Sequence, residues 1–405
     1  MAEKIVISFD DEETEKPQKP EDKIIIEIKP AEKPDKSKEI KNSTLNFQYR
    51  GNTHLAGLDE SPLTYPAGLE NGFGKIFSVS LKDNFLNSIL LTNKFIILSS
   101  SGGSIYFVDR FRGELVSRCI IENEAFEKTG IVIKNKVYIN SVKSIYSYDD
   151  SLNEKKIYES AGGYYIWAHL NKSGKQIIFL EYSPELKIAV PVVFNPESGE
   201  YKKCREINIR HYISDALITC EGFAYILHDN VILKTDLKDY SSVSYQLNFD
   251  ISPDSNFLLS DGKIYFNNGN NELFYFDIKN EDIKFTGIKC GYINSLASVG
   301  DNIFIGLISG WQLFKASGMP VYTYDDITEN RIESLNRHIL AVSKENKIIF
   351  HNLDKFQEAE GFSLTTGGME SDKIISARIG EDAVFVLSKN GILEAFNNDK
   401  LNIVI

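Results

Sequence analysis

Four cysteines and six histidines are the side chains of this chain best suited to nucleophilic or metal chemistry. The cysteines show no Cys-x-x-Cys spacing and no histidine at ligand intervals, so we expect scattered, reduced thiols in a core. The histidines lie in predicted strands and turns without a Gly-x-Ser-x-Gly motif, which would mark a serine nucleophile. These patterns predict no catalytic residue and no metal site. The cysteines are Cys119, Cys204, Cys220 and Cys290.

Two further ligand-binding patterns are missing from the sequence. A phosphate-cradling loop combines glycines with a lysine, and the nearest candidate, Gly102-Gly103, is more simply a turn. A calcium loop needs several carboxylates together, as in Asp-x-Asp-x-Asp, and no such run occurs. We therefore expect no cofactor.

The composition favours a large β-rich core. The chain has 405 residues, 42% of them hydrophobic, with 20 Tyr and 25 Phe, which pack well on pleated strands. Its net charge of −12 argues against nucleic acid as a partner, because phosphate binding depends on Lys and Arg displacing counterions.

Residues 101–119 contain the pattern that the rest of the chain repeats. An alternating strand leads to a polar turn from Asp109 to Gly113, and a second strand follows. From about residue 87 the chain contains eight such units of about 37 to 46 residues, the period of four-stranded propeller blades. The residues that end the alternating strands are Asp109, Asp149, Asn195, Asp236, Asp277, Lys315, Asn352 and Asn397.

The fold prediction follows from these repeats. No segment has a convincing helical period, so we expect an all-β protein. Residues 46–405 should form an eight-bladed β-propeller of four-stranded antiparallel blades. The Asp and Asn residues at the strand ends should bind the backbone two residues on and tolerate a left-handed conformation.

Residues 1–45 form a different kind of segment, rich in proline and charge, which we expect to be disordered. Two short β-branched runs interrupt it, each flanked by carboxylates. Each run is predicted to bind a protein partner by adding a strand to an exposed edge of the partner's sheet. Two such runs on one flexible arm would increase the overall affinity through avidity. Alternatively they are incidental, or one pairs with this protein's own sheet. The predicted binding residues are Ile5, Val6, Ile7, Ile24, Ile25 and Ile26.

The first residues, Met-Ala-Glu-Lys, start no apolar run of signal-peptide length, and no lipidation cysteine or membrane-spanning stretch is found. We therefore expect a cytoplasmic protein with no direct membrane insertion, with the cytoplasmic side of a membrane-associated complex as a further option. The Lys-, Asn- and Ile-rich usage suggests a bacterial source.

A lead-in before the repeats reads Tyr49-Arg50-Gly51-Asn52-x-His54-x-x-Gly57, followed by Gly74-Lys75-x-Phe77. This lead-in resembles that of pyrroloquinoline-quinone-like β-propeller proteins. In its plain interpretation, Gly51 and Gly57 permit a compact loop that His54 anchors by hydrogen bonds.

The repeat of residues 103–116 is similar to the family's repeat as well. The resemblance implies that the lead-in strand pairs with the last blade and closes the ring. The family's repeat tryptophans are missing, so other aromatic and aliphatic residues should fill those positions. The adjacent cysteines of quinone-dependent dehydrogenases are also missing, so we expect a divergent, non-enzymatic member.

Two clusters in the repeats could contact a partner. Tyr164, Tyr165 and Trp167 follow a glycine pair and are predicted to form a binding surface on a propeller face; alternatively they are an inner strand packed on its neighbour. Arg205, Arg210 and His211 form a small basic cluster for which a solvated loop is the simpler interpretation.

The sequence thus predicts a non-catalytic scaffold. The propeller should serve as a platform in a multiprotein complex and the arm as a tether. One alternative is a small-ligand sensor or enzyme using the central channel. Another alternative is a role similar to that of the propeller lipoprotein of outer-membrane protein assembly, which binds its partners by strand addition.

Overall fold

The computed structural model describes residues 74–397 except 129, 134–135, 167–168, 212–216, 253–254, 300, 326–330, 336–338, 345–346, 353–360, 366–372 and 381–382. The chain divides into two compact units, Met1–Ser43 and Thr44–Ile405, and every described residue belongs to the second. The described residues form strands and turns without a helix, which confirms the all-β prediction for them. No helix able to cross a membrane is found in this part of the chain.

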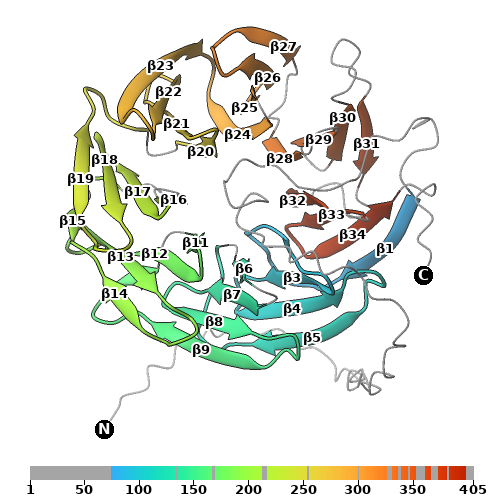
Figure 1. The fold of residues 1–405 in the computed structure, drawn as a ribbon. Helices are drawn as coiled ribbons and strands as arrows, with labels where there is room; N and C mark the ends of the chain where they lie inside the picture. The colour runs from blue at the N-terminus through green and yellow to red at the C-terminus, as the bar shows by residue number, and fades with distance from the viewer. Residues whose placement is uncertain are drawn as a thin grey trace, which may run out of the picture. The chain divides into compact units, whose positions relative to one another are not determined.

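The strands form antiparallel sheets that follow one another around a ring (Figure 1). In most sheets four strands run in sequence order from the inside of the ring to the outside. The first sheets are β2 Leu90–Leu91, β3 Phe95–Ser99, β4 Ser104–Asp109 and β5 Leu115–Ile120; then β6 Ile131–Ile133, β7 Lys136–Asn140, β8 Ser144–Tyr148 and β9 Glu154–Glu159.

Five further four-stranded sheets are present; four follow the same plan, and in the last one β1 (Gly74–Ser80) takes the outermost position. They are β16 Leu217–Cys220, β17 Phe223–His228, β18 Val231–Asp236 and β19 Ser242–Gln246; β20 Leu258–Ser260, β21 Lys263–Asn267, β22 Glu272–Asp277 and β23 Asp282–Lys289; β24 Ile293–Val299, β25 Asn302–Leu307, β26 Gly310–Lys315 and β27 Pro320–Asp325; β28 Arg331–Leu335, β29 Ile339–Lys344, β30 Lys347–Asn352 and β31 Gly361–Thr365; and β32 Ile374–Ile379, β33 Val384–Ser388 and β34 Ile392–Asn397 with β1 Gly74–Ser80.

The sheet between β9 and β16 departs from this plan, because it has six strands. β10 Tyr165–Ile166 and β11 Asn171–Ser173 both pair with β12 Gln176–Ser183, while β14 Tyr201–Lys203 and β15 Ile207–Asn208 both pair with β13 Ile188–Phe194. The prediction of eight four-stranded blades is therefore wrong: the described strands make seven four-stranded blades and this six-stranded sheet.

Pro191 in the middle of β13 explains the break on the outer side. Its carbonyl accepts a hydrogen bond from Cys204 N–H at 2.8 Å, so this side of the residue faces the outer strand. Proline has no N–H to donate there, and the ladder between β13 and its outer neighbour is interrupted at this residue. The outer strand is consequently divided into β14 and β15.

Ring closure follows the prediction from the lead-in segment. β1 pairs antiparallel with β34, the last described strand, from Gly74 opposite Asn397 to Ser80 opposite Ile392. Lys75 Nζ lies 2.6 Å from Oε1 of Glu394, a buried carboxylate on β34. The outermost strand of the last sheet thus comes from the start of the propeller.

Five of the eight strand-end residues act as turn formers, as predicted. Asp109 Oδ1 accepts hydrogen bonds from the N–H groups of Phe111 and Arg112, at 2.9 and 2.8 Å. Asp149, Asn195, Asp236 and Asp277 bind backbone N–H groups in the same way.

The predicted left-handed conformation of the strand-end residues is wrong, because Asp109 is still part of its extended strand. Positive φ angles fall four residues later, at Gly113 (70°), Gly199 (78°), Tyr240 (66°) and Glu281 (52°).

The core lies between neighbouring sheets. Phe107 of β4 packs on Tyr148 of β8 with ring centroids 5.1 Å apart, and Tyr225 of β17 packs on Phe276 of β22 at 6.0 Å. These contacts fill the joints with Phe and Tyr, as the missing tryptophans led us to expect. Each sheet is therefore held by the sheets beside it.

Candidate functional site

The predicted clusters of residues 164–165 and 210–211 lie on one face of the ring. Antiparallel strands alternate in direction, so the turns between second and third strands share one face. The β7–β8 turn with Lys143 and the β17–β18 turn with Asp229 belong to this face. Tyr165 pairs with Tyr182 near the end of β12, where the same kind of turn begins.

Tyr164 and Tyr165 are both predicted to bind a partner. Tyr165 begins β10, at the inner side of the six-stranded sheet, and Tyr164 directly precedes it. Gly162 and Gly163 before them have φ angles of 67° and 80°, which glycine adopts without steric cost. Both tyrosines are partly exposed, so they can contact a partner, and this role stays a prediction. Trp167, the third residue of this predicted surface, lies outside the described residues.

Two lysines flank the tyrosines. Lys143 Nζ lies 5.8 Å from the ring centre of Tyr165, and Lys203 Nζ lies 5.4 Å from that of Tyr164. Ammonium groups at these distances are attracted to the ring faces. The surface is thus basic and aromatic within an acidic protein.

A buried carboxylate, Glu181, lies beside this surface and links two sheets. It accepts hydrogen bonds from Tyr158 Oη at 2.8 Å and Ser160 Oγ at 2.6 Å, and it forms an ion pair with Lys203. Burial and then the hydrogen bond to Glu181 raise the pKa of Tyr158, so its hydroxyl stays a donor. The negative charge of Glu181 is therefore compensated by hydrogen bonds and an ion pair within the protein.

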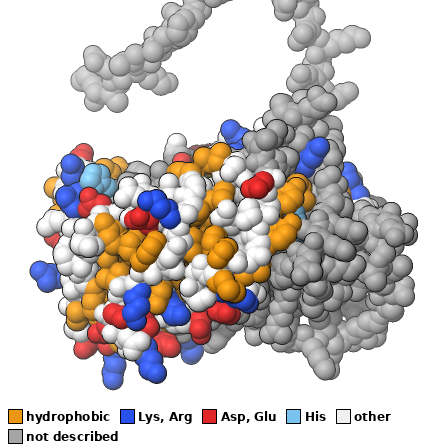
Figure 2. All heavy atoms as spheres, turned by 90° about the horizontal axis from the view of Figure 1, so that it is seen from above, with side chains coloured by type: hydrophobic (Ala, Val, Ile, Leu, Met, Phe, Trp, Pro, Cys, Tyr) orange, Lys and Arg blue, Asp and Glu red, His pale blue; other side chains and the backbone are white. Residues whose placement is uncertain are grey.

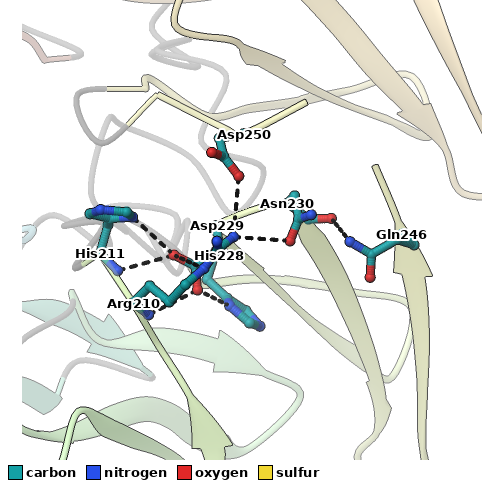
Figure 3. A network of polar contacts seen from close by, with 7 residues as sticks. All are labelled: Arg210, His211, His228, Asp229, Asn230, Gln246 and Asp250. Carbon is teal, nitrogen blue, oxygen red and sulfur yellow. Dashed lines mark hydrogen bonds and ion pairs between the residues drawn. The ribbon is translucent and has the colours of Figure 1, made fainter. Parts of the chain in front are cut away.

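Arg210 and His211 of the predicted basic cluster belong to a network around Asp229 (Figure 3). Their backbone N–H groups donate to Oδ2 and Oδ1 of Asp229 at 2.9 and 3.0 Å. The imidazoles of His211 and His228 each place Nδ1 3.3 Å from an oxygen of the same carboxylate. Arg205 is exposed on the surface.

Asp229 connects three successive sheets. It forms the β17–β18 turn with a φ of 47°, and its carbonyl accepts a hydrogen bond from Ile251 N–H at 2.6 Å, in the connection to β20. Arg210, which follows β15, also contacts Asp250 at 3.3 Å. The solvated-loop interpretation therefore describes only the side chains of Arg210 and His211, because their backbone anchors the joint.

The charge of Asp229 is stabilised where it is buried. Burial raises the pKa of this carboxyl group, but hydrogen bonds from the Arg210 backbone, His228 and the His211 backbone together outweigh it, so the pKa is lowered. The network is thus an anion site that the protein's own carboxylate already fills.

Sequence reasoning missed two equivalent polar joints near the start of the ring. Tyr106 Oη donates to Asp83 at 2.8 Å, and Tyr146 Oη donates to Glu124 at 3.1 Å. Burial and then the hydrogen bond to Asp83 raise the pKa of Tyr106 to about 12. The repeated Ser-Ile-Tyr of residues 104–106 and 144–146 was the available signal.

The described residues also include cysteines and histidines, the side chains best suited to metal binding or nucleophilic chemistry. No three His, Cys, Asp or Glu side chains there lie close enough together to hold a metal ion. The four cysteines are half-buried and free, and burial raises the pKa of Cys290 to about 11. His351 is buried, accepts a hydrogen bond from Trp311 Nε1 at 3.3 Å, and has its pKa lowered to about 4 by burial.

The remaining predicted site residues lie outside the described part of the chain. These are His54 of the lead-in and the two β-branched runs, Ile5, Val6, Ile7, Ile24, Ile25 and Ile26.

Comparison with known proteins supports the fold class. No protein-family model and no curated protein matches the chain. The computationally designed protein Ika8 is similar in structure, with a TM-score of 0.63 and 10% identity over 80% of this chain and 99% of that one. BamB from Moraxella catarrhalis is similar as well, with a TM-score of 0.59 and 12% identity over 80% of this chain and all of its own.

These two likenesses and the observed sheets show that the chain has a β-propeller fold similar to that of BamB. Identities this low show the fold alone.

Proposed function

We propose that the protein is a non-catalytic interaction scaffold whose propeller serves as a platform in a multiprotein complex. In this proposal the six-stranded sheet takes the place of one blade and completes an eight-bladed ring. The chain would be a divergent, non-enzymatic member of the pyrroloquinoline-quinone-like propellers. The observation that carries the proposal is the exposed apolar surface on the outermost strands.

Several outermost strands expose large hydrophobic side chains to solvent. Figure 2 views the ring from the side of β23 and β27 and shows hydrophobic side chains between charged ones. On those two strands Phe285 and Val321 are exposed. Exposed apolar surface on edge strands is a usual sign of protein contacts. The strands β1, β5 and β19 contribute Ile76, Leu115, Val116, Ile120 and Val243.

The packing between sheets favours a rigid platform. Apolar clusters join the first sheet to the last through side chains such as Leu98 and Phe385. The same kind of packing joins the sheets that follow. A ring of this kind presents loops and edges without rearranging, which lowers the entropy cost of binding.

The arm is proposed as the tether. Its two β-branched runs would add strands to a partner's sheet, so the propeller and the arm would hold separate partners. The proposed location is the cytoplasm of a bacterium, at a soluble or membrane-associated complex.

The proposal is tested by purifying the full chain from its native cells with whatever binds it. We expect a partner in a fixed ratio to the wild-type chain. The double variants Ile5→Asp/Ile7→Asp and Ile24→Asp/Ile26→Asp should lose one partner while the propeller stays folded. Recovery of no partner by any of these chains would contradict the proposal and favour a search for a small ligand in the channel.

A further inference from the structure

The outer edge of β5 differs from the other outermost strands in its exposed side chains. Ile120 is 61% exposed, and Leu115 and Val116 are exposed beside it. The only charged residue on this strand is Arg118. No described strand pairs with β5 on its outer side, so this edge is open in the described part of the chain.

The backbone of β5 offers hydrogen-bonding groups at this edge. Ile121 N–H donates to the carbonyl of Gly103 at 2.9 Å, toward the inside of the sheet. N–H groups of alternate residues point to the same side of a strand, so those of Arg118 and Ile120 point outward. A bulge at Val116 ends this regular stretch, because Phe107 pairs with Ser117 while Val108 pairs with Leu115.

Arg118 is held in place at the centre of the edge. Its guanidinium lies 5.1 Å from the ring centre of Tyr106 and donates to Ser104 Oγ at 2.9 Å. The ion pair with Asp83 is long, at 3.7 Å, and 45% of the Arg118 side chain is exposed. A guanidinium has five N–H donors, so it can also take a carboxylate from outside.

We propose that the edge of β5 binds an extended segment of a partner protein with an acidic residue between two apolar ones. Val116, Arg118 and Ile120 are two residues apart and lie on one side of the strand. A partner strand beside them places its own alternate residues opposite, so the matching pattern is apolar-x-Asp/Glu-x-apolar. This inference rests on the proposed scaffold function and names one of its binding surfaces and the chemistry of the partner.

The test uses the full chain and the acetylated, amidated peptide Ser-Thr-Ile-Thr-Glu-Thr-Ile-Thr-Ser, with a second peptide that has Lys in place of Glu. Binding is measured by fluorescence anisotropy and by hydrogen exchange of β5 amides. We expect the wild type to prefer the Glu peptide about tenfold, and Arg118→Glu to reverse this preference. The amides of Arg118 and Ile120 should exchange more slowly when the Glu peptide binds.

Lys156→Glu is the matched control. Lys156 lies opposite Tyr146 on β9 as Arg118 lies opposite Tyr106 on β5, so it changes the same charge on the neighbouring sheet. Its affinity for both peptides should equal that of the wild type. Ile120→Asp should weaken binding of both peptides, because it places a charge in the apolar contact.

Three results would overturn the inference. Slow exchange at Arg118 and Ile120 without peptide would mean that the chain itself covers the edge. Protection that rises with protein concentration would mean that a second copy covers it. Equal affinity of both peptides for wild type and Arg118→Glu would mean that β5 does not select them.

The inference and the scaffold proposal fail separately. If Arg118→Glu still brings down the partner of the wild type, the scaffold stands and this surface is not where it binds. If no partner is recovered but the peptides bind as expected, the edge exists without the proposed function.

Discussion

β5 and β9 occupy the same position in neighbouring sheets and present opposite surfaces. Each strand pairs with a strand whose tyrosine donates a hydrogen bond to a carboxylate. Tyr106 donates to Asp83 beside β5, and Tyr146 donates to Glu124 beside β9. β5 exposes Leu115, Val116 and Ile120, whereas β9 exposes Glu154, Lys155, Lys156 and Glu159. The shared parts are the ones that hold sheets together. This difference between the two strands lies at exposed positions. Folding places few constraints on the residue types there, so binding to a partner can determine them.

The largest expected effect comes from the core that both strands share. Phe107 contacts Tyr148 across the two sheets, so Phe107→Ala should lower the free energy of unfolding by about 3 to 5 kcal/mol. The exposed Phe111 is the control, and Phe111→Ala should change it by less than about 0.5 kcal/mol. Urea unfolding followed by circular dichroism measures both. Equal losses would show that the sheets do not stabilise each other here.

The next effect is at the other side of β9, where Tyr158 meets Glu181. Glu181→Ala leaves the buried Tyr158 hydroxyl and the part-buried Ser160 hydroxyl without their acceptor and removes the carboxylate partner of Lys203, whose side chain is 38% exposed, so it should cost about 3 kcal/mol. Glu197→Ala removes an exposed partner of Lys175 and should cost about 0 to 1 kcal/mol. Thermal unfolding of both variants measures these two losses of stability. A neutral Glu181→Ala would mean that this joint adds nothing to the ring.

A smaller and equal effect is expected at the two equivalent tyrosines. Tyr106→Phe and Tyr146→Phe each remove one hydrogen bond to a carboxylate, which should cost about 1 to 2 kcal/mol. Similar losses in urea midpoints would show that both sheets use the same joint. A large loss of stability in only one of the two variants would show that the hydrogen bonds beside β5 and β9 are not equivalent.

The smallest effect concerns acid stability at the β5 joint. Burial raises the pKa of Asp83, but hydrogen bonds from Tyr106, the Asn84 backbone and nearby serines outweigh it and lower the pKa. A lowered pKa contributes stability at higher pH, and this contribution is lost as the pH falls below about 4 and through the folded-state pKa. Asp83→Asn should therefore flatten the fall in unfolding free energy as the pH decreases below about 4. An unchanged slope would contradict this role.

Much of the fold could be predicted because its signals are local. Asp109 and Asp277 end strands in sequence and structure, since their carboxylates bind N–H groups two residues on. The count of four-stranded blades was wrong because one sheet has a divided inner strand and a divided outer strand, and Pro191 explains only the outer division.

The candidate sites were less predictable. Arg210 and His211 were noticed as charges, but their carboxylate, Asp229, lies 18 to 19 residues further on. Nothing in the spacing of these residues pairs them. The partner of Tyr106 is 23 residues away and equally hidden from local patterns.

The sequence by itself determined the repeated strands, the turns that join them and the all-β class. Alternation of side chains and turn hydrogen bonds depend on neighbours in the chain, so they are written in it directly. Only the tertiary structure decided which carboxylates hold neighbouring sheets together, how β1 pairs with β34 and which outermost strands expose apolar side chains. These features depend on segments brought together when the ring closes, with Lys75 and Glu394 separated by 319 residues.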